Sequence, residues 1–161
     1  MEPPRFAADA MLGRLARWLR VLGYDTSYDA AIADPVLVAQ ANAEGRVLLT
    51  RDRHLLRELH PLRAHEVRQD QPLAQLAAVV DALGLADTPP RVLFTRCLLC
   101  NCLLDAIPPA EALPLLPPGV RDIPGPVRRC PCCQRMYWDG SHVRRMRGAL
   151  QRAVPQLPLA G

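Results

Sequence analysis

Four of the six cysteines form two pairs with the spacing of a metal site. Two residues separate Cys97 from Cys100 and Cys130 from Cys133, and 29 residues lie between the two pairs. A gap of two residues lets both thiolates of a pair bind one tetrahedral ion. Four cysteine ligands leave no open position on the ion. The spacing therefore predicts a structural zinc site that replaces a hydrophobic core in this part of the chain.

An even number of cysteines would also permit disulfides, and a Cys-x-x-Cys pair can carry redox chemistry. The first residues lack the basic region and apolar segment of a secretion signal, and no stretch reaches the roughly 18 apolar residues of a membrane span. We therefore expect a cytoplasmic protein with no membrane contact, in a reducing compartment that favours metal ligation. Cys102 and Cys132 lie outside the four-cysteine set and are expected to be non-ligand thiols.

Three aspartates mark a second candidate site. Asp9 follows an apolar run, Asp52 follows the run at residues 46–50, and Asp34 begins the intervening helical segment. The carboxyl ends of parallel strands meet at one edge of a sheet, where ligands bind in α/β folds. Carboxylates gathered there repel one another unless a divalent cation neutralises them, and hard oxygen ligands favour Mg²⁺ or Mn²⁺. Such ions activate water in phosphodiester cleavage.

Helix capping is the alternative interpretation of these aspartates. Asp34 precedes Pro35 in the pattern of an N-cap, Asp9 can cap a helix that starts near residue 11, and Asp52 can cap the segment 53–60. Asp25 is a weaker candidate for the acidic site, because it only flanks a β-prone segment.

Basic and aromatic residues near both sites are candidates for nucleic-acid contact. Aromatic faces stack on bases, and guanidinium groups bind phosphate. Arg14 and Arg17 are one helical turn apart just after Asp9. The alternatives are that the aromatics pack on the small metal core and that the arginines form a solvated helix face. The full candidate set is Arg14, Arg17, Arg51, Tyr137, Trp138, His142, Arg144 and Arg145.

Short apolar runs alternate with helical patterns through residues 4–84, which favours a mostly parallel sheet with helices on both faces. Leucines recur at helical spacing over residues 12–22, Gly23 is a helix stop, and Pro72 opens a strong helical pattern. The expected strands are at residues 4–8, 24–28, 46–50 and 64–68, and the expected helices at 11–22, 34–44, 53–60 and 71–85.

Charge and composition change near residue 90. The chain has 161 residues, a net charge of +4 and 20 basic residues, all of them arginine. Residues 1–90 carry a net charge of −2 and residues 91–161 a net charge of +6. We expect an α/β domain over 1–90, a zinc ribbon with a proline-rich loop over 91–150, and a frayed tail over 151–161.

The chain resembles a known family over roughly residues 5–147. The motifs are FAADAMLGRLARWLRVLGYDTSYD, AEGRVLLTRDRHL, RCLLCNCLLD and CPCCQRMYWDGSHVRRM, in this order. They are similar to the Mut-seven C-terminal RNase domain family, a branch of the PIN-like nucleases fused to a zinc ribbon. The resemblance implies a PIN-like fold and a divalent-metal-dependent ribonuclease whose acidic site maps onto Asp9, Asp34 and Asp52, with Asp25 a further member.

One position departs from the PIN-like pattern. Related proteins often carry a second acid two positions after the residue that matches Asp52, where this chain has His54. Fewer carboxylates would mean one metal rather than two, weaker catalysis, or none. The leading hypothesis is an endoribonuclease that acts on single-stranded RNA with Mg²⁺ or Mn²⁺, supported by a zinc ribbon. The alternative is a non-catalytic RNA-binding or adaptor module organised by the ribbon.

Overall fold

The computed structural model describes residues 2–89, 91–120, 122 and 125–160, and its centre is a parallel four-stranded sheet. The strand order is β2-β1-β3-β4, and β1 pairs with both β2 and β3. The strands are β1 (Phe6–Ala8), β2 (Thr26–Tyr28), β3 (Val47–Thr50) and β4 (Ala64–Glu66).

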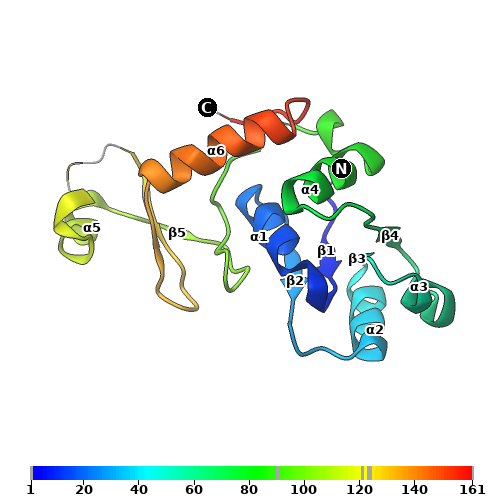
Figure 1. Ribbon diagram of the computed structural model, residues 1–161. Coiled ribbons are helices and arrows are strands. Elements are labelled where there is room, and N and C mark those ends of the chain that lie inside the picture. Colours follow the sequence, from blue (N-terminus) through cyan, green and yellow to red (C-terminus); the bar gives the residue numbers. More distant parts are fainter. Residues whose placement is uncertain (1, 90, 121, 123–124, 161) are drawn as a thin grey trace.

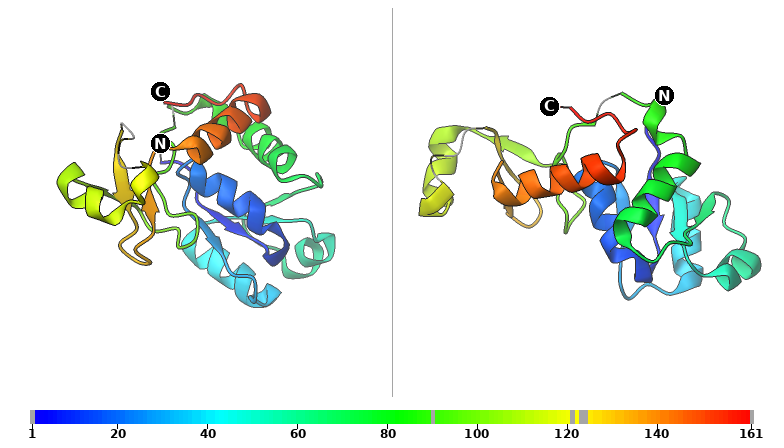
Figure 2. Two further views of the ribbon diagram at one scale, coloured as in Figure 1. Left: turned by 60° about the vertical axis from the view of Figure 1, so that its left-hand side comes forward. Right: turned by 45° about the horizontal axis from the view of Figure 1, so that its top comes forward.

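Helices cover both faces of this sheet (Figures 1 and 2). Helices α1, α4 and α6 pack on one face, and α2 and α3 on the other. The elements are η1 (Ala10–Leu12), α1 (Gly13–Val21), α2 (Asp34–Glu44), α3 (Arg53–Leu59), α4 (Pro72–Ala82), η2 (Leu85–Asp87) and α6 (Ser141–Ala153). The α/β class with a parallel sheet, predicted from the sequence, is confirmed.

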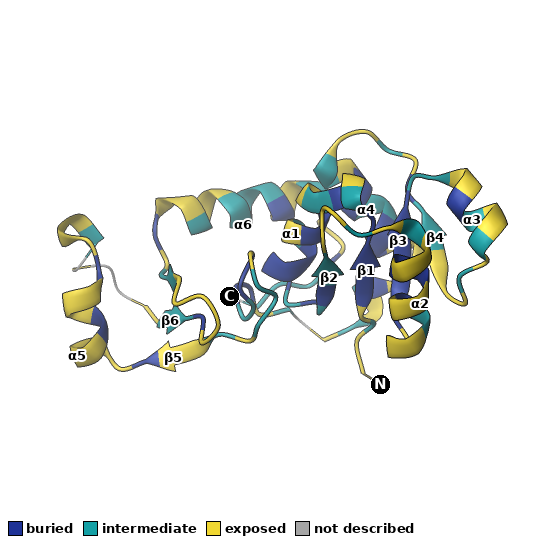
Figure 3. Ribbon diagram, turned by 90° about the horizontal axis from the view of Figure 1, so that it is seen from below, coloured by how far each residue is buried: buried dark blue, intermediate teal, exposed yellow. Residues whose placement is uncertain are grey.

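The central strands are buried on both faces because their apolar residues alternate between two cores. Phe6 and Ala8 of β1 pack with α1, α4 and α6, whereas Ala7 packs with α2 and α3. Leu48 and Leu49 of β3 divide between the two cores in the same way, and Figure 3 shows buried residues in β1 and β3 at the centre of the α/β part.

The sheet has a topological switch point between β1 and β3. The connection from β1 to β2 passes through α1 on one face, and the connection from β2 to β3 passes through α2 on the other. The connection that leaves β3 passes through α3 to β4, on the side of β3 away from β1, so the chain leaves β1 and β3 in opposite directions. In open α/β sheets, ligands bind in the crevice at the carboxyl ends of such a strand pair.

A smaller antiparallel sheet, β5-β6-β7, follows the α/β part. It includes much of the proline-rich segment, which is more ordered than the predicted loop, because Ile107, Ala112 and Leu116 form a small apolar core of their own. The elements are β5 (Asp105–Ile107), α5 (Pro109–Ala112), η3 (Leu113–Leu115), η4 (Pro118–Val120), β6 (Val127–Arg129) and β7 (Met136–Tyr137).

The predicted frayed tail is wrong for the described residues up to 160. Helix α6 continues to Ala153, and the side chains of Val154 and Leu157 are buried in the main core. Two backbone hydrogen bonds join Arg91 to the tail, from its N–H to the carbonyl of Pro158 and from the N–H of Ala160 to its carbonyl. Apolar contacts therefore hold the segment in place. In the described part of the chain, no helix is long and apolar enough to cross a membrane.

Candidate active site and zinc site

The hydroxyl of Thr50 connects two of the predicted acidic residues. Thr50 ends β3, and its Oγ1 donates a hydrogen bond to Oδ2 of Asp9 (2.7 Å). The same oxygen accepts a hydrogen bond from the backbone N–H of Asp52 (3.0 Å). The pairing of β1 with β3 extends to Asp9, because the backbone N–H of Asp9 donates a hydrogen bond to the carbonyl of Leu49. Asp9 and Asp52 therefore meet at the carboxyl ends of β1 and β3, at the switch point.

Both carboxylates also cap the start of a helix. Oδ1 of the buried Asp9 accepts a hydrogen bond from the N–H of Ala10 at the start of η1. Oδ1 of Asp52 accepts hydrogen bonds from the N–H groups of His54 and Leu55, which open α3. The capping interpretation is therefore correct for these two residues. Because a carboxylate has about four lone-pair sites, capping leaves capacity for a cation.

Asp34 differs from its predicted N-cap role. The N-cap of α2 is Ala33, and Asp34 occupies the first helical position and makes no capping hydrogen bond. Helix α2 follows β2 and returns to the amino end of β3, so Asp34 starts on the same side of the sheet as the end of β2. Within the described chain, only cysteines form groups of three or more ligand atoms that lie within 4.8 Å of one another, so the three aspartates form no closed set.

The donor set at the switch point suits a hard cation that keeps part of its water shell. Mg²⁺ is usually held by one or two carboxylates together with water and substrate phosphate. Asp9 and Asp52 supply two carboxylates from the ends of the neighbouring strands β1 and β3, and the hydroxyl of Thr50 orients the carboxylate of Asp9. These residues therefore fit Mg²⁺ or Mn²⁺, with Asp34 as an outlying third acid.

Asp25 does not join the acidic site. It precedes β2 and therefore lies at the amino edge of the sheet, opposite Asp9. Its carboxylate forms an ion pair with Arg46 (2.7 Å) and accepts a hydrogen bond from the side-chain amide of Asn101 (2.7 Å). Burial would raise the pKa of Asp25, but these two partners outweigh it and lower the pKa. Asp25, the weaker candidate for the acidic site, therefore lies apart from Asp9 and joins β2 to Arg46 and Asn101.

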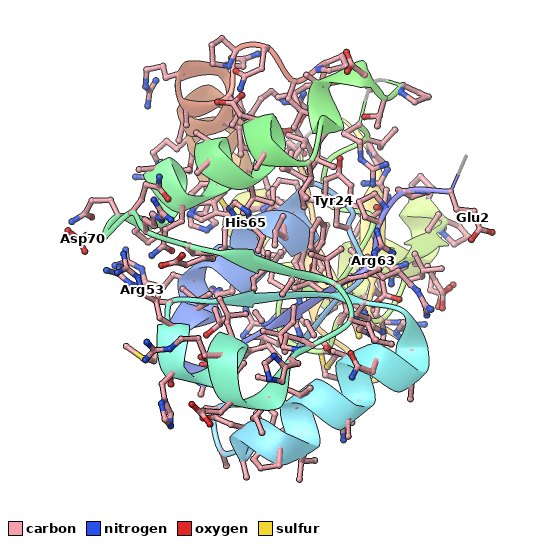
Figure 4. The ribbon with its side chains drawn as sticks, turned by 90° about the vertical axis from the view of Figure 1, so that its right-hand side faces the viewer. Glu2, Tyr24, Arg53, Arg63, His65 and Asp70 are labelled. Carbon is pink, nitrogen blue, oxygen red and sulfur yellow. A yellow bond between two sulfur atoms is a disulfide. The ribbon has the colours of Figure 1, made fainter. Side chains whose placement is uncertain are left out.

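Two polar residues at the carboxyl edge were not predicted from the sequence. Thr50 is a β-branched residue at the end of a strand, which is a common position for threonine, so its residue type does not indicate a role in the site. Glu66 ends β4 opposite Thr50 and forms ion pairs with Arg53 (2.6 Å) and Arg68 (3.3 Å). Figure 4 shows Arg53 and Asp70 toward this edge of the sheet and Glu2 and Arg63 toward the other. The only sign of Glu66 in the sequence is that it is a charged residue within a segment predicted to be a strand.

The four predicted zinc ligands come together. The sulfur atoms of Cys97, Cys100, Cys130 and Cys133 all lie within 4.8 Å of one another, and Sγ of Cys97 is 3.7 Å from Sγ of Cys133. Thiolates around a tetrahedral zinc ion are about 3.8 Å apart, for a Zn–S bond of about 2.3 Å. The cluster has the composition and spacing to hold zinc.

Neighbouring groups favour the thiolate form at one of these ligands. Burial would raise the pKa of Cys97, but the hydroxyl of Tyr137 (3.2 Å) and the N–H groups of Cys100 and Leu99 outweigh it and lower the pKa to about 6. The pKa of Cys100 moves the other way, to about 12, because of its interaction with Cys133, its burial and its proximity to Cys97. Four neighbouring thiols resist joint ionisation, so a dication is needed to hold all four as thiolates.

Cys102 and Cys132 form a disulfide, which corrects their prediction as non-ligand thiols. Their Cα atoms are 6.7 Å apart. Cys102 follows the first cysteine pair by two residues, and Cys132 lies between the two cysteines of the second pair. Folding brings the two pairs together and thereby also brings these two residues together. The disulfide and the four-cysteine cluster thus join the same two segments.

A comparison with protein-family models gives a match over residues 4–150, to the Mut7-C RNase domain. The chain belongs to this family. Comparisons with curated proteins and with solved structures give no match. The Mut7-C match covers the sheet, the cysteine cluster and most of α6, so the two candidate sites are parts of one family domain.

The Mut7-C chain holds its cysteine cluster against α1 through a buried arginine. Arg20 is 5% exposed and donates to the carbonyls of Leu98 (2.8 Å), Leu99 (3.2 Å) and Thr26 (3.0 Å). Burial lowers the pKa of Arg20, whereas the nearby Cys97 and Cys100 raise it. A tetrathiolate zinc site carries a charge of about −2, which this guanidinium partly offsets.

The candidate RNA-contacting residues fall into two groups. Arg17, Tyr137, Trp138, His142 and Arg144 line one cavity, and Arg14 and Arg145 are exposed nearby on α1 and α6. Arg51 lies elsewhere, at the carboxyl edge, and its guanidinium binds Asp70 (2.8 Å) and the carbonyl of Gln69 (2.6 Å).

The aromatic residues of this group also have the structural role that was the alternative interpretation. Tyr137 donates to Cys97 and accepts from the N–H of Leu98 (3.0 Å), and Trp138 packs on the small core of Ile107, Ala112 and Leu116.

Proposed function

We propose that this Mut7-C domain is a divalent-metal-dependent ribonuclease that cleaves RNA at the carboxyl ends of β1 and β3. The observation that carries the proposal is the Asp9–Thr50–Asp52 connection at the switch point. This is the place where an open α/β sheet binds its ligand, and the residues there are hard oxygen donors. Membership of an RNase domain family supports the same activity.

In this proposal each residue has a separate task. Asp9 and Asp52 hold Mg²⁺ or Mn²⁺, and Asp34 contributes from the start of α2. The ion, when bound, supplies an activated water and neutralises charge on the scissile phosphate. Thr50 keeps the carboxylate of Asp9 in one orientation through its hydrogen bond. Arg14 and Arg17 follow Asp9 on α1 and bind the RNA backbone.

A second candidate function is RNA binding without cleavage. The observation in its favour is that the carboxylates of Asp9 and Asp52 each accept helix-capping hydrogen bonds, which gives both residues a structural reason to be there. In that case the ribbon and α6 make the contacts, and the acidic edge has no catalytic task.

Cleavage of end-labelled single-stranded RNA in Mn²⁺, with and without EDTA, separates the two functions. We expect wild-type cleavage that EDTA abolishes, and loss of cleavage in Asp9→Asn and Asp52→Asn. Glu58→Gln, which changes an exposed acid on α3, is the matched control and should cleave normally. Equal traces of product from wild type and both Asn variants would contradict the nuclease proposal and favour the binding module.

A further inference from the structure

A cavity of about 480 Å³ lies where α1, the cysteine ribbon and the start of α6 meet. Its walls combine residues far apart in sequence, with Arg17 from α1, Leu99 from the first cysteine pair and His142 from α6. This volume is within the usual range for a site that takes a small molecule or one unit of a polymer, about 300–1,000 Å³. We call this cavity the ribbon groove.

Cationic side chains line the ribbon groove. Arg17, Arg135 and Arg144 line it together with His142, and the described residues that form its walls include no Asp or Glu. The first turn of α6, which borders the groove, also contains no acid. Arginines that line one groove without a carboxylate partner attract a polyanion, and their planar donors match phosphate oxygens.

The inner walls of the groove are apolar and aromatic. Trp138 and Leu99 line it beside Met136 and Val143, and Leu99 is 51% exposed although it is a large apolar residue. A ligand with phosphate groups and a flat apolar face would satisfy both kinds of wall at once. A nucleotide has this combination, because every base offers a π face beside its charged backbone. A base held in a duplex cannot offer that face to a pocket.

Helix α1 links the groove to the acidic edge. Helix α1 begins beside Asp9 and carries first Arg14 and then Arg17, both exposed and one turn apart. A rise of about 1.5 Å per residue places Arg17 about 6 Å along the helix from its first residue. An RNA strand that lies in the groove can therefore follow α1 past Arg17 and Arg14 to Asp9.

We propose that the ribbon groove binds unpaired nucleotides of the RNA substrate, with one base against Trp138 and Leu99 and the adjoining phosphates on Arg17 and Arg144. The inference rests on the proposed function for its choice of RNA, and it adds that the substrate is single-stranded at this point and that the strand runs along α1.

Binding measured in zinc-containing buffer, without added Mg²⁺ or Mn²⁺ and without a chelator, tests this inference apart from metal-dependent cleavage. The probe is a fluorescein-labelled oligouridylate of about twelve nucleotides, and anisotropy gives its affinity for the full chain at several salt concentrations. For Arg144→Ala we expect weaker binding and a fall of about 0.7 in the slope of log K against log salt, which is the loss of one phosphate contact to a single strand. Arg152→Ala changes another exposed arginine of the same helix, about 12 Å further along it, and should leave the slope unchanged.

Tryptophan fluorescence tests the contact between a base and Trp138. Trp18 and Trp138 are the only tryptophans, so in a Trp18→Phe background the emission reports Trp138 alone. We expect saturable quenching of that emission by oligouridylate. We also expect Leu99→Glu to weaken binding by about tenfold, because it removes an apolar contact and adds a negative charge beside the phosphates. Leu99→Glu changes an exposed side chain, so the fold should survive; circular dichroism checks this.

The outcomes distinguish this inference from the proposed function. If oligouridylate binds with unchanged Trp138 emission and equal affinity for Leu99→Glu, the groove is not the RNA site, whatever the cleavage assay shows. Stronger binding of a duplex of the same length, or equal binding of an acidic peptide, would also overturn it. Quenching and salt dependence as expected, together with no cleavage in Mn²⁺, would support the groove and contradict the nuclease.

Discussion

Thr50 and Asp9 are joined by a hydrogen bond of 2.7 Å between a hydroxyl and a carboxylate that are both buried. The two residues come from neighbouring parallel strands and are 41 positions apart in the sequence. Because the same hydroxyl accepts from the N–H of Asp52, its loss would leave two polar groups of the acidic edge without this partner.

The first prediction concerns this hydroxyl. Thr50→Val keeps the shape of the side chain but removes the donor, so Asp9 is no longer held in one orientation. We expect kcat or Mn²⁺ affinity to fall about 10- to 100-fold, the usual cost of losing a residue that orients a metal ligand. Thr50→Ser restores the hydroxyl and should recover most of the activity. If Thr50→Val cleaves RNA as wild type does, the hydrogen bond has only a structural role.

The second prediction concerns the two crosslinks between the cysteine pairs. In the chain-entropy account, a disulfide that closes 30 residues adds about 3–4 kcal/mol to the free energy of unfolding. Zinc bound to Cys97, Cys100, Cys130 and Cys133 already closes nearly the same loop. We therefore expect Cys102→Ser/Cys132→Ser to cost less than about 1 kcal/mol with zinc and about 3 kcal/mol after chelation.

Urea denaturation with and without a chelator, alongside the zinc content of each protein, measures this coupling. Both forms should carry one zinc per chain before chelation. Equal costs in the two conditions would mean that the disulfide and the metal constrain different parts of the chain.

The third prediction concerns pH and Asp25. The folded pKa of Asp25 is lowered by Arg46 and Asn101 against the effect of burial, so the folded state favours the carboxylate. The resulting stability is present above the unfolded pKa of about 3.9 and is lost as the pH falls through the lower folded value. Asp25→Asn should cost about 2 kcal/mol at neutral pH and progressively less below about pH 4.

Urea unfolding curves across this range provide the measurement, and Glu58→Gln, an exposed acid on α3, is the control. A cost for Asp25→Asn that stays constant down to about pH 2 would show that the charge of Asp25 contributes nothing.

The fourth prediction concerns the C-terminal segment. Leu157 is 3% exposed and packs in the main core, so Leu157→Ala should lower the free energy of unfolding by about 2–4 kcal/mol. Leu115→Ala, at a half-exposed position on η3, should cost much less. Thermal unfolding of the two variants gives the comparison, and similar melting temperatures would indicate that the tail is only loosely attached.

Residue type and spacing were enough to predict the parts of the molecule that depend on local pattern. The alternation of apolar runs and helical segments predicted the parallel sheet, and strand ends placed Asp9 and Asp52 at one edge. The Cys-x-x-Cys spacing predicted which four sulfur atoms gather. Each of these features follows from the period of a helix or strand, or from the reach of a two-residue turn.

Features that depend on distant contacts could not be read from the chain. The partner of Thr50 is 41 residues away, and the partners of Arg20 in the first cysteine pair are 78 and 79 residues away. Arg20 looks like a surface residue of an amphipathic helix until the ribbon covers it. Cys102 meets Cys132, and Leu157 meets the core, only after the chain has folded back on itself.

The fixed attachment of the ribbon has a consequence for the position of the cut. Arg20 and the Asp25–Asn101 hydrogen bond clamp the first cysteine pair to the α/β part, while α6 packs on α4. If RNA enters the ribbon groove as proposed, the held nucleotide and the cut bond are a constant interval apart. The nucleotide that the groove holds would then decide which bond is cut.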